Sequence, residues 1–258
     1  MYVYKPKIVL VSFFKPKRIN MRGLGTIINI ALIVLAGTFG CSFSSKMKEK
    51  MQETLFLVTG VAVIFIGIAG AMEQMLCIEN GKLSPRNIMM VICCLAIGAI
   101  VGECFDLDGK INQFADYVKK KSNNGNDTKF VVAFVNTSCV VCIGAMAVIG
   151  AIKDGVDGDI TVLAAKGVID FILVSVMSAS LGKGCMFSAI PVAIFQGSIT
   201  ILAMMLNSVV PEVALDNLSC VGSILIFCVG VNMVFDRKIR VANILPAVII
   251  AVLWGMVF

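Results

Sequence analysis

The chain has 258 residues, of which 59% are hydrophobic and only 15% are charged, with a net charge of +6. Soluble domains carry about 25% charged residues, so this composition excludes an ordinary soluble protein and indicates one that lies mostly in lipid. The sequence has no histidine, the commonest general base and transition-metal ligand, so metalloenzymes and most hydrolases are disfavoured. We expect neither an enzyme nor a bound metal or cofactor.

Residues 1–20 differ from the rest of the chain. Basic side chains flank a short apolar run there, and no small-residue cleavage site follows, so a secretory signal is not predicted. We interpret 1–20 as an N-terminal extension and consider Met21 an equally good start of translation. The remainder, 21–258, is expected to form a single integral membrane domain.

Apolar runs long enough to cross a hydrocarbon core of about 30 Å recur through this domain. They predict an all-α, polytopic bundle of about eight transmembrane helices, or seven if the short seventh or eighth run does not cross. The predicted spans are 24–43, 54–72, 87–104, 130–152, 160–181, 185–206, 218–234 and 241–258.

The segment between the third and fourth spans predicts an amphipathic helix. Asp108 can cap this helix. One face then carries Ile111, Phe114, Ala115 and Val118, while the other face is charged. This pattern is typical of a helix that lies on the membrane surface.

The fourth span contains polar side chains and spaced glycines, including Asn136, Ser138, Gly144 and Gly150. Glycines of this kind either let helices pack closely or mark a locally broken helix whose freed backbone lines a cavity. Close packing is the commoner cause, and both interpretations stay open at this point.

The fifth span carries two ionisable residues, Lys166 and Asp170. Four residues apart on a helix, they share one face and can form an ion pair. An ionisable group at the bilayer centre costs roughly 2.5–3.5 kcal/mol, so such groups tend to line ion or proton pathways. Asp170 lies near the middle of the span, whereas Lys166 is nearer one end and could extend to the headgroups. The alternative is a structural pair that ties helices together.

Further polar side chains in the spans extend the candidate pathway. They are Asn29, Asn136, Ser138, Gln196 and Asn232. Single amides in transmembrane helices usually bond neighbouring helices, and that alternative applies to each of them. Before the fifth span, an acidic turn contains Asp154, Asp157 and Asp159. It is interpreted as a solvated loop or as a mouth that attracts cations.

Basic residues predict the orientation. The loops after the first, third, fifth and seventh spans carry twelve Lys and Arg residues, against four on the opposite side when the chain is counted from Met21. Because basic loops stay in the cytoplasm, both termini are expected outside. The expected partners are the lipid bilayer and a small ion or solute. No nucleic-acid footprint is present in the sequence, and homo-oligomer formation stays open.

A weak internal repeat links the two ends of the domain. Residues 53–67 resemble 216–230, and 86–88 resemble 242–244, so spans one to three would match spans six to eight. Corresponding spans are an odd number of spans apart, which would give the two copies opposite orientations. Such inverted repeats are the architecture of many secondary transporters. The alternative is that any two glycine-containing apolar helices look alike.

Short motifs distributed along the chain carry a family resemblance. They are Gly25 to Asn29, Gln52-Glu53, Gly98 to Glu103, Phe134 to Met146, Lys166 with Asp170, Pro191 to Gly197, and Arg240 to Pro246. From Met21 onward, the sequence resembles the YqgA/YdfK family of prokaryotic inner-membrane proteins (domain of unknown function 554). Ala145 stands where the family often has proline, which argues against a break in the fourth span. The resemblance implies a multi-pass protein of the bacterial plasma membrane and no particular activity.

Together these patterns favour a secondary transporter or channel for a small ion or solute, with Lys166 and Asp170 at a site near the midplane. The alternative is a non-transporting membrane assembly or signalling protein in which the Lys–Asp pair is structural.

Overall fold

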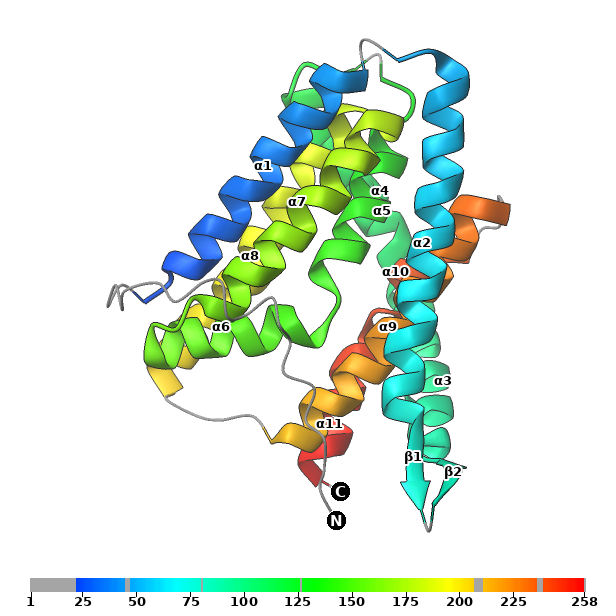
Figure 1. The fold of residues 1–258 in the computed structure, drawn as a ribbon, viewed down its shortest axis with the longest axis vertical. Helices are drawn as coiled ribbons and strands as arrows, with labels where there is room; N and C mark the ends of the chain where they lie inside the picture. The colour runs from blue at the N-terminus through cyan, green and yellow to red at the C-terminus, as the bar shows by residue number, and fades with distance from the viewer. Residues whose placement is uncertain are drawn as a thin grey trace.

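The computed structural model describes residues 22–44, 47–79, 81–125, 127–206, 211–235 and 239–257, so the predicted extension at 1–20 lies outside it. These residues form a helical bundle with one short hairpin, which confirms the all-α prediction (Figure 1). The helices are α1 (Leu24–Ser44), α2 (Glu49–Met75), α3 (Ile88–Phe105), α4 (Leu107–Lys121), α5 (Phe130–Cys142), α6 (Ala145–Asp157), α7 (Thr161–Leu181), η2 (Lys183–Ser188, a 3₁₀ helix), α8 (Ala189–Leu206), α9 (Glu212–Phe235), α10 (Val241–Ile244) and α11 (Pro246–Val257).

The structure has six or seven candidate membrane spans, so the predicted count of eight is not confirmed, whereas the alternative of seven lies within this range. Within the described residues, six segments are long and apolar enough to cross a membrane: α1, α2, α3, α7, the continuous run Lys183–Met205, and α9. The bent pair of α5 and α6 would make seven. The predicted eighth span is divided into α10 and α11. Together they form one apolar helix, Val241–Val257, whose 17 residues cover about 26 Å at 1.5 Å per residue, short of a hydrocarbon core of about 30 Å.

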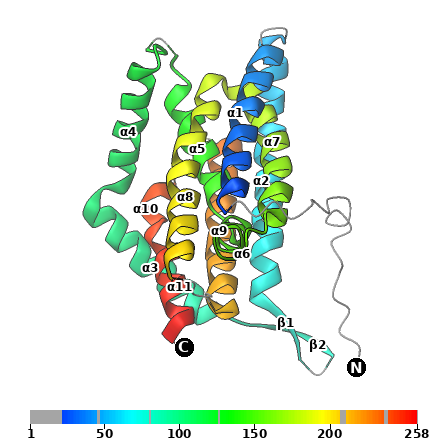
Figure 2. The same ribbon diagram turned by 90° about the vertical axis from the view of Figure 1, so that its left-hand side faces the viewer.

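The long helices run up and down the bundle, and α6 lies across it (Figures 1 and 2). The most extensive helix–helix packing joins α2 to α9 and α1 to α7. Lipid gives little hydrophobic drive for helix association, so close backbone approach at small residues has to stabilise such pairs. The α3 helix packs on the α10–α11 segment in this way, with Gly98 against Ala247 and Gly102 against Asn243.

A β-hairpin extends one end of the bundle and was not predicted. Strands β1 (Leu76–Glu79) and β2 (Lys82–Pro85) pair antiparallel directly after α2 (Figure 1). Their side chains are largely exposed or half-buried, so the hairpin lies outside the packed interior.

The predicted amphipathic helix exists as α4, with two corrections. Its N-terminal cap is Asp106, whose carboxylate accepts a hydrogen bond from the Gly109 N–H at 3.3 Å, and not Asp108. Its apolar face is also not left for lipid, because Ala115 and Val118 are buried against α5. Figure 2 shows α4 running alongside α5 instead of across the bundle.

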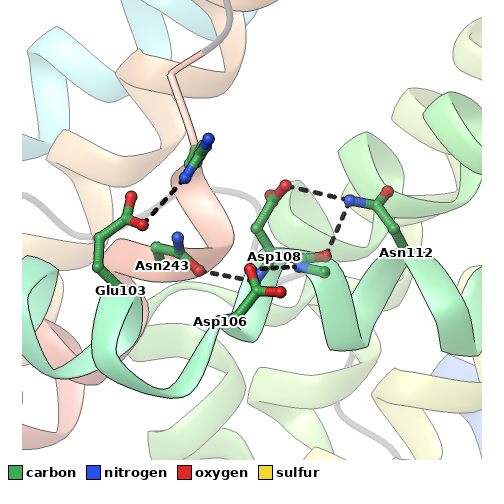
Figure 3. A network of polar contacts seen from close by, with 7 residues as sticks. Glu103, Asp106, Asp108, Asn112 and Asn243 are labelled. Atoms are coloured by element: carbon green, nitrogen blue, oxygen red, sulfur yellow. Dashed lines mark hydrogen bonds and ion pairs between the residues drawn. The ribbon is translucent and has the colours of Figure 1, made fainter.

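Polar contacts fix the junction between α3 and α4 to α10 (Figure 3). The Asp108 N–H donates to Asn243 Oδ1 at 2.7 Å, and Asn112 Nδ2 donates to Asp108 Oδ2 at 3.1 Å. Arg240 Nη1 also donates to Glu103 Oε2 at 3.0 Å. These bonds hold the start of α4 against the C-terminal helices, so the α3–α4 angle is set by tertiary contacts.

Candidate functional site

The fourth predicted span is a broken helix. The α5 helix ends at Cys142 and α6 begins at Ala145, with axes bent by 62°. Between them, Gly144 has φ +152°, a backbone conformation that side-chain-bearing residues rarely adopt. Both sequence interpretations therefore hold, the break at Gly144 and close packing at Gly150, where an added Cβ would meet Leu163 Cδ2 at 2.7 Å. The family proline is not needed at position 145, because Gly144 provides the conformational freedom.

Lys166 joins the broken helix to the buried carboxylate of Asp170. An α-helix leaves its last carbonyl groups without intrahelical partners. Lys166 Nζ donates to one of these, the Val141 O, at 2.8 Å, and it also forms an ion pair with Asp170 Oδ2. The positive charge at the C-terminus of α5 is further favoured by the helix dipole. Lys166 and Asp170 are 7% and 5% exposed, so Lys166 does not extend to the headgroups.

An amide pair lies beside Asp170. Asn29 Nδ2 of α1 donates to Gln196 Oε1 of α8 at 3.0 Å, and both side chains are fully buried. The Asn29 amide also lies next to the Asp170 carboxylate. Within the described residues, Asn29 Oδ1 and Gln196 Nε2 have no hydrogen-bond partner. One free acceptor and one free donor are therefore buried close to the ion pair.

Asp154 is a fully buried carboxylate near the end of α6. It accepts hydrogen bonds from the Gly23 N–H at 3.1 Å and from the Thr26 N–H at 3.0 Å, so it caps the N-terminus of α1 from another helix. The Thr26 hydroxyl contacts Asp154 Oδ2 at 3.3 Å and the Thr200 hydroxyl at 2.9 Å. These two threonines thus connect Asp154 to α8.

The predicted acidic turn is therefore wrong for Asp154. Because α6 continues to Asp157, Asp154 lies on a helix and faces α1, whereas Asp157 and Asp159 are exposed as expected. Sequence reasoning also missed Thr26 and Thr200. A signal was present, because each lies three or four residues from Asn29 or Gln196 and so on the same helix face.

Three predicted pathway residues lie elsewhere. Asn136 and Asn232 line a cavity of about 830 Å³ between α2, α4, α5, α9 and α10. Asn232 also bonds the backbone of Ile239 in both directions, which fixes the turn after α9. Ser138 lines a separate, nearly apolar cavity of about 310 Å³, and its hydroxyl donates to the Phe134 O at 2.5 Å. The structure brings together only Asn29, Lys166, Asp170 and Gln196.

We expect Asp154→Ala to lower the free energy of unfolding by about 1–2 kcal/mol, because α1 then loses its cap. Thermal unfolding in detergent measures the change. Asp157→Ala is the matched control, since Asp157 lies on the same helix and is exposed. Equal unfolding temperatures for the two variants would contradict the capping role of Asp154.

Comparison with known proteins gives a family and two relatives. Residues 24–256 match the family model described as a protein of unknown function, DUF554. The chain is 26% identical over 226 residues to the "Uncharacterized membrane protein YdfK" of Bacillus subtilis, covering 88% of this chain and 93% of that protein. It is 23% identical over 232 residues to the "Uncharacterized protein YqgA" of Escherichia coli, covering 88% and 94%. No solved structure matches. Together with the apolar helices, these relatives identify a multi-pass membrane protein.

Proposed function

The chain belongs to the DUF554 family of proteins of unknown function, and from this premise we propose that it is a secondary transporter or channel for a small ion or solute. The observation that carries the proposal is the position of Lys166. Its ammonium group holds both the mid-span carboxylate of Asp170 and the free carbonyl end of the broken helix α5. A transport role is proposed in preference to a catalytic one.

A broken helix beside a buried ion pair supports transport for an energetic reason. Backbone groups without partners are costly at membrane depth, and non-helical backbone is tolerated there where protein buries it or where it lines a cavity. Transporters often bind ions and substrates at the ends of such discontinuous helices, near the middle of the bilayer. Lys166 donates a hydrogen bond to the carbonyl end of α5. This bond can break when the ammonium group moves to another partner in the transport cycle.

The larger cavity supports access to α5 from one end of the bundle. Polar residues from α2, α4, α5 and α9 line it, including Glu53, Asp108, Asn136 and Asn232, and it reaches Cys139 on α5. A volume of about 830 Å³ is within the usual range for small-molecule sites. The cavity lies where α2 begins and α9 ends, at the end that carries the basic loops. We propose that this end faces the cytoplasm of a bacterium, with both termini outside the plasma membrane.

We also propose that α1–α3 and α8, α9 and α11 form an inverted repeat. Residues 53–67 and 216–230 correspond in sequence, so Gly67 matches Gly230 and Ile64 matches Phe227. A Cβ placed on Gly67 would meet the Phe227 N at 2.5 Å, and one placed on Gly230 would meet the Ile64 N at 2.7 Å. Contacts of this reciprocal kind are what a two-fold relation between α2 and α9 requires.

A second candidate function is a non-transporting assembly or signalling protein with a structural ion pair. This candidate is favoured because Lys166 and Asp170 already have protein partners for their charges. Lys166 and Asp170 partner each other, Lys166 also bonds Val141, and neither side chain lines the two cavities described above. This candidate predicts that substitutions of the pair change stability or oligomeric state, with no flux to lose.

Reconstitution into liposomes tests the proposal. Ion gradients of H⁺, Na⁺, K⁺ and Cl⁻ are imposed in turn, and the resulting currents are recorded on a solid-supported membrane. We expect the wild-type protein to give a current above that of empty liposomes, and Asp170→Asn and Lys166→Met to lower it by at least about tenfold, because charged groups in a span line the pathway. Currents that are unchanged in both variants at equal protein content would contradict the assignment.

A further inference from the structure

We propose that the seam between α1 and α8 is a proton path that leads from Asp154 to Asp170, with one bound water molecule as a relay. This inference rests on the proposed function and makes it specific, since it names the proton as the transported or coupling ion. It also assigns a site to a water molecule between Asn29 Oδ1 and Gln196 Nε2.

The first observation is a set of buried polar side chains on four neighbouring helices. They come from α1, α6, α7 and α8, and each is at most 7% exposed: Thr26, Asn29, Asp154, Lys166, Asp170, Gln196 and Thr200. Polar groups at membrane depth are costly and therefore tend to be functional. Most of the remaining interior is lined by apolar residues, so these polar side chains are concentrated at one place in the bundle.

The second observation is the order of the contacts. Asp154 Oδ2 lies 3.3 Å from the Thr26 hydroxyl, which lies 2.9 Å from the Thr200 hydroxyl. One helical turn further along each helix, Asn29 bonds Gln196 at 3.0 Å, and the Asn29 amide lies next to Asp170. The Thr26 and Thr200 hydroxyls, each of which can accept one proton while donating another, therefore lead from Asp154 toward the amide pair that lies next to Asp170.

The third observation is the pair of unpartnered atoms on the Asn29 and Gln196 amides. In the part of the chain that the structure describes, Asn29 Oδ1 lacks a donor and Gln196 Nε2 lacks an acceptor, and both side chains are fully buried. A water molecule can donate to the first atom and accept from the second, which is how buried waters satisfy such groups. A metal cation would be repelled by the Gln196 N–H. The site therefore fits water and the proton better than Na⁺ or K⁺.

The proton transfer conserves protons and involves no redox step. A proton from the water phase joins the Asp154 carboxylate, which lies on the helix end that carries exposed Lys153 and Asp157. The hydroxyls and the relay water each accept one proton and release another, and the last proton forms an O–H bond on Asp170. Neutral Asp170 then loses its ionic attraction to Lys166, which keeps its bond to the Val141 O.

Apart from Lys166, no charged side chain of the four described helices faces the buried polar residues between Asp154 and Asp170. Among the described residues of α1, α6, α7 and α8, the charged side chains are Lys153, Asp154, Asp157, Lys166 and Asp170. Lys153 and Asp157 are exposed, so Lys166 is the charged group that faces the carboxylates from within the bundle. The state of Asp170 therefore depends on Lys166 and on proton supply along the seam.

Infrared spectroscopy of aspartate-labelled protein in oriented proteoliposomes tests the path. The pH outside is lowered rapidly, and the C=O band of protonated Asp170, identified by its absence in Asp170→Asn, is followed with time. We expect Thr200→Val and Gln196→Leu each to slow the appearance of this band by at least about tenfold, because the first removes a relay hydroxyl and the second removes the amide that would hold the relay water. Thr59→Val is the matched control, since Thr59 is a buried threonine of α2 whose hydroxyl donates to the Leu55 O of the same helix.

The outcomes separate this inference from the proposed function. Wild-type rates in both seam variants, or an Asp170 band that responds only to pH on the opposite side, would overturn the proton path. A sodium-driven current that needs Asp170 but is unaffected by Thr200→Val would leave transport standing and would also overturn the path. Slowed protonation in both seam variants, with no current in any gradient, would support the path and count against transport.

Discussion

Lys166→Met should lower the free energy of unfolding by about 3–5 kcal/mol, the usual cost of removing one partner from a buried ion pair. The variant leaves the Asp170 carboxylate, 5% exposed, without its counter-charge. It also leaves the Val141 O without the bond that Lys166 Nζ supplies at 2.8 Å. Unfolding in mixed micelles, followed by circular dichroism, measures the effect.

Two further variants show whether a loss of stability in Lys166→Met comes from breaking the buried pair. The double variant Lys166→Met/Asp170→Leu should return to within about 2 kcal/mol of the wild type, because apolar replacement of a whole buried pair is often neutral. Lys153→Met removes an exposed lysine from α6 and should have no measurable effect. A Lys166→Met variant as stable as Lys153→Met would show that the buried pair does not form.

Gly67→Ala and Gly230→Ala should each destabilise the protein, by about 1–3 kcal/mol and by similar amounts. In both variants the added methyl group meets a backbone nitrogen of the facing helix, at 2.5 Å for Gly67 and 2.7 Å for Gly230. A backbone atom cannot move aside by changing rotamer, so α2 and α9 must separate. The same unfolding measurement in mixed micelles applies here.

Gly197→Ala is the matched control for both glycines. Gly197 also lies within a helix, but a Cβ there would meet nothing within 4 Å. Its substitution should leave stability unchanged or raise it by up to about 1 kcal/mol, the difference in helix propensity. If Gly230→Ala behaved like Gly197→Ala while Gly67→Ala was destabilising, the reciprocal packing, and with it the proposed inverted repeat, would be contradicted.

The positions of the long helices were predictable because each one coincides with a continuous apolar run in the sequence. The predicted span 160–181 is observed as Thr161–Leu181, and 24–43 as Leu24–Ser44. The break in the fourth span depends on the conformation of Gly144, which the sequence does not specify. The hairpin after α2 had a local signal that was overlooked, because Asn80-Gly81 is a strong two-residue turn motif between strands.

The candidate site was predicted in part. Lys166, Asp170, Asn29 and Gln196 stood out because each is polar within an apolar span, and the structure brings them together. Asp154 was assigned to an acidic turn because its burial depends on how α6 packs against α1. Asn136, Ser138 and Asn232 were grouped with the pair although they lie at other cavities, because polarity within a span does not reveal which helix faces it.

The central claim is that the Lys166–Asp170 pair belongs to a transport route and is more than a structural tie. The most direct test is the ion-gradient current of liposomes that contain the folded double variant Lys166→Met/Asp170→Leu, at the same protein content as the wild type. Because this variant replaces the whole pair by apolar side chains and is expected to fold, a loss of current is separated from a loss of stability. We predict a current no larger than that of empty liposomes, and a wild-type current would contradict the claim.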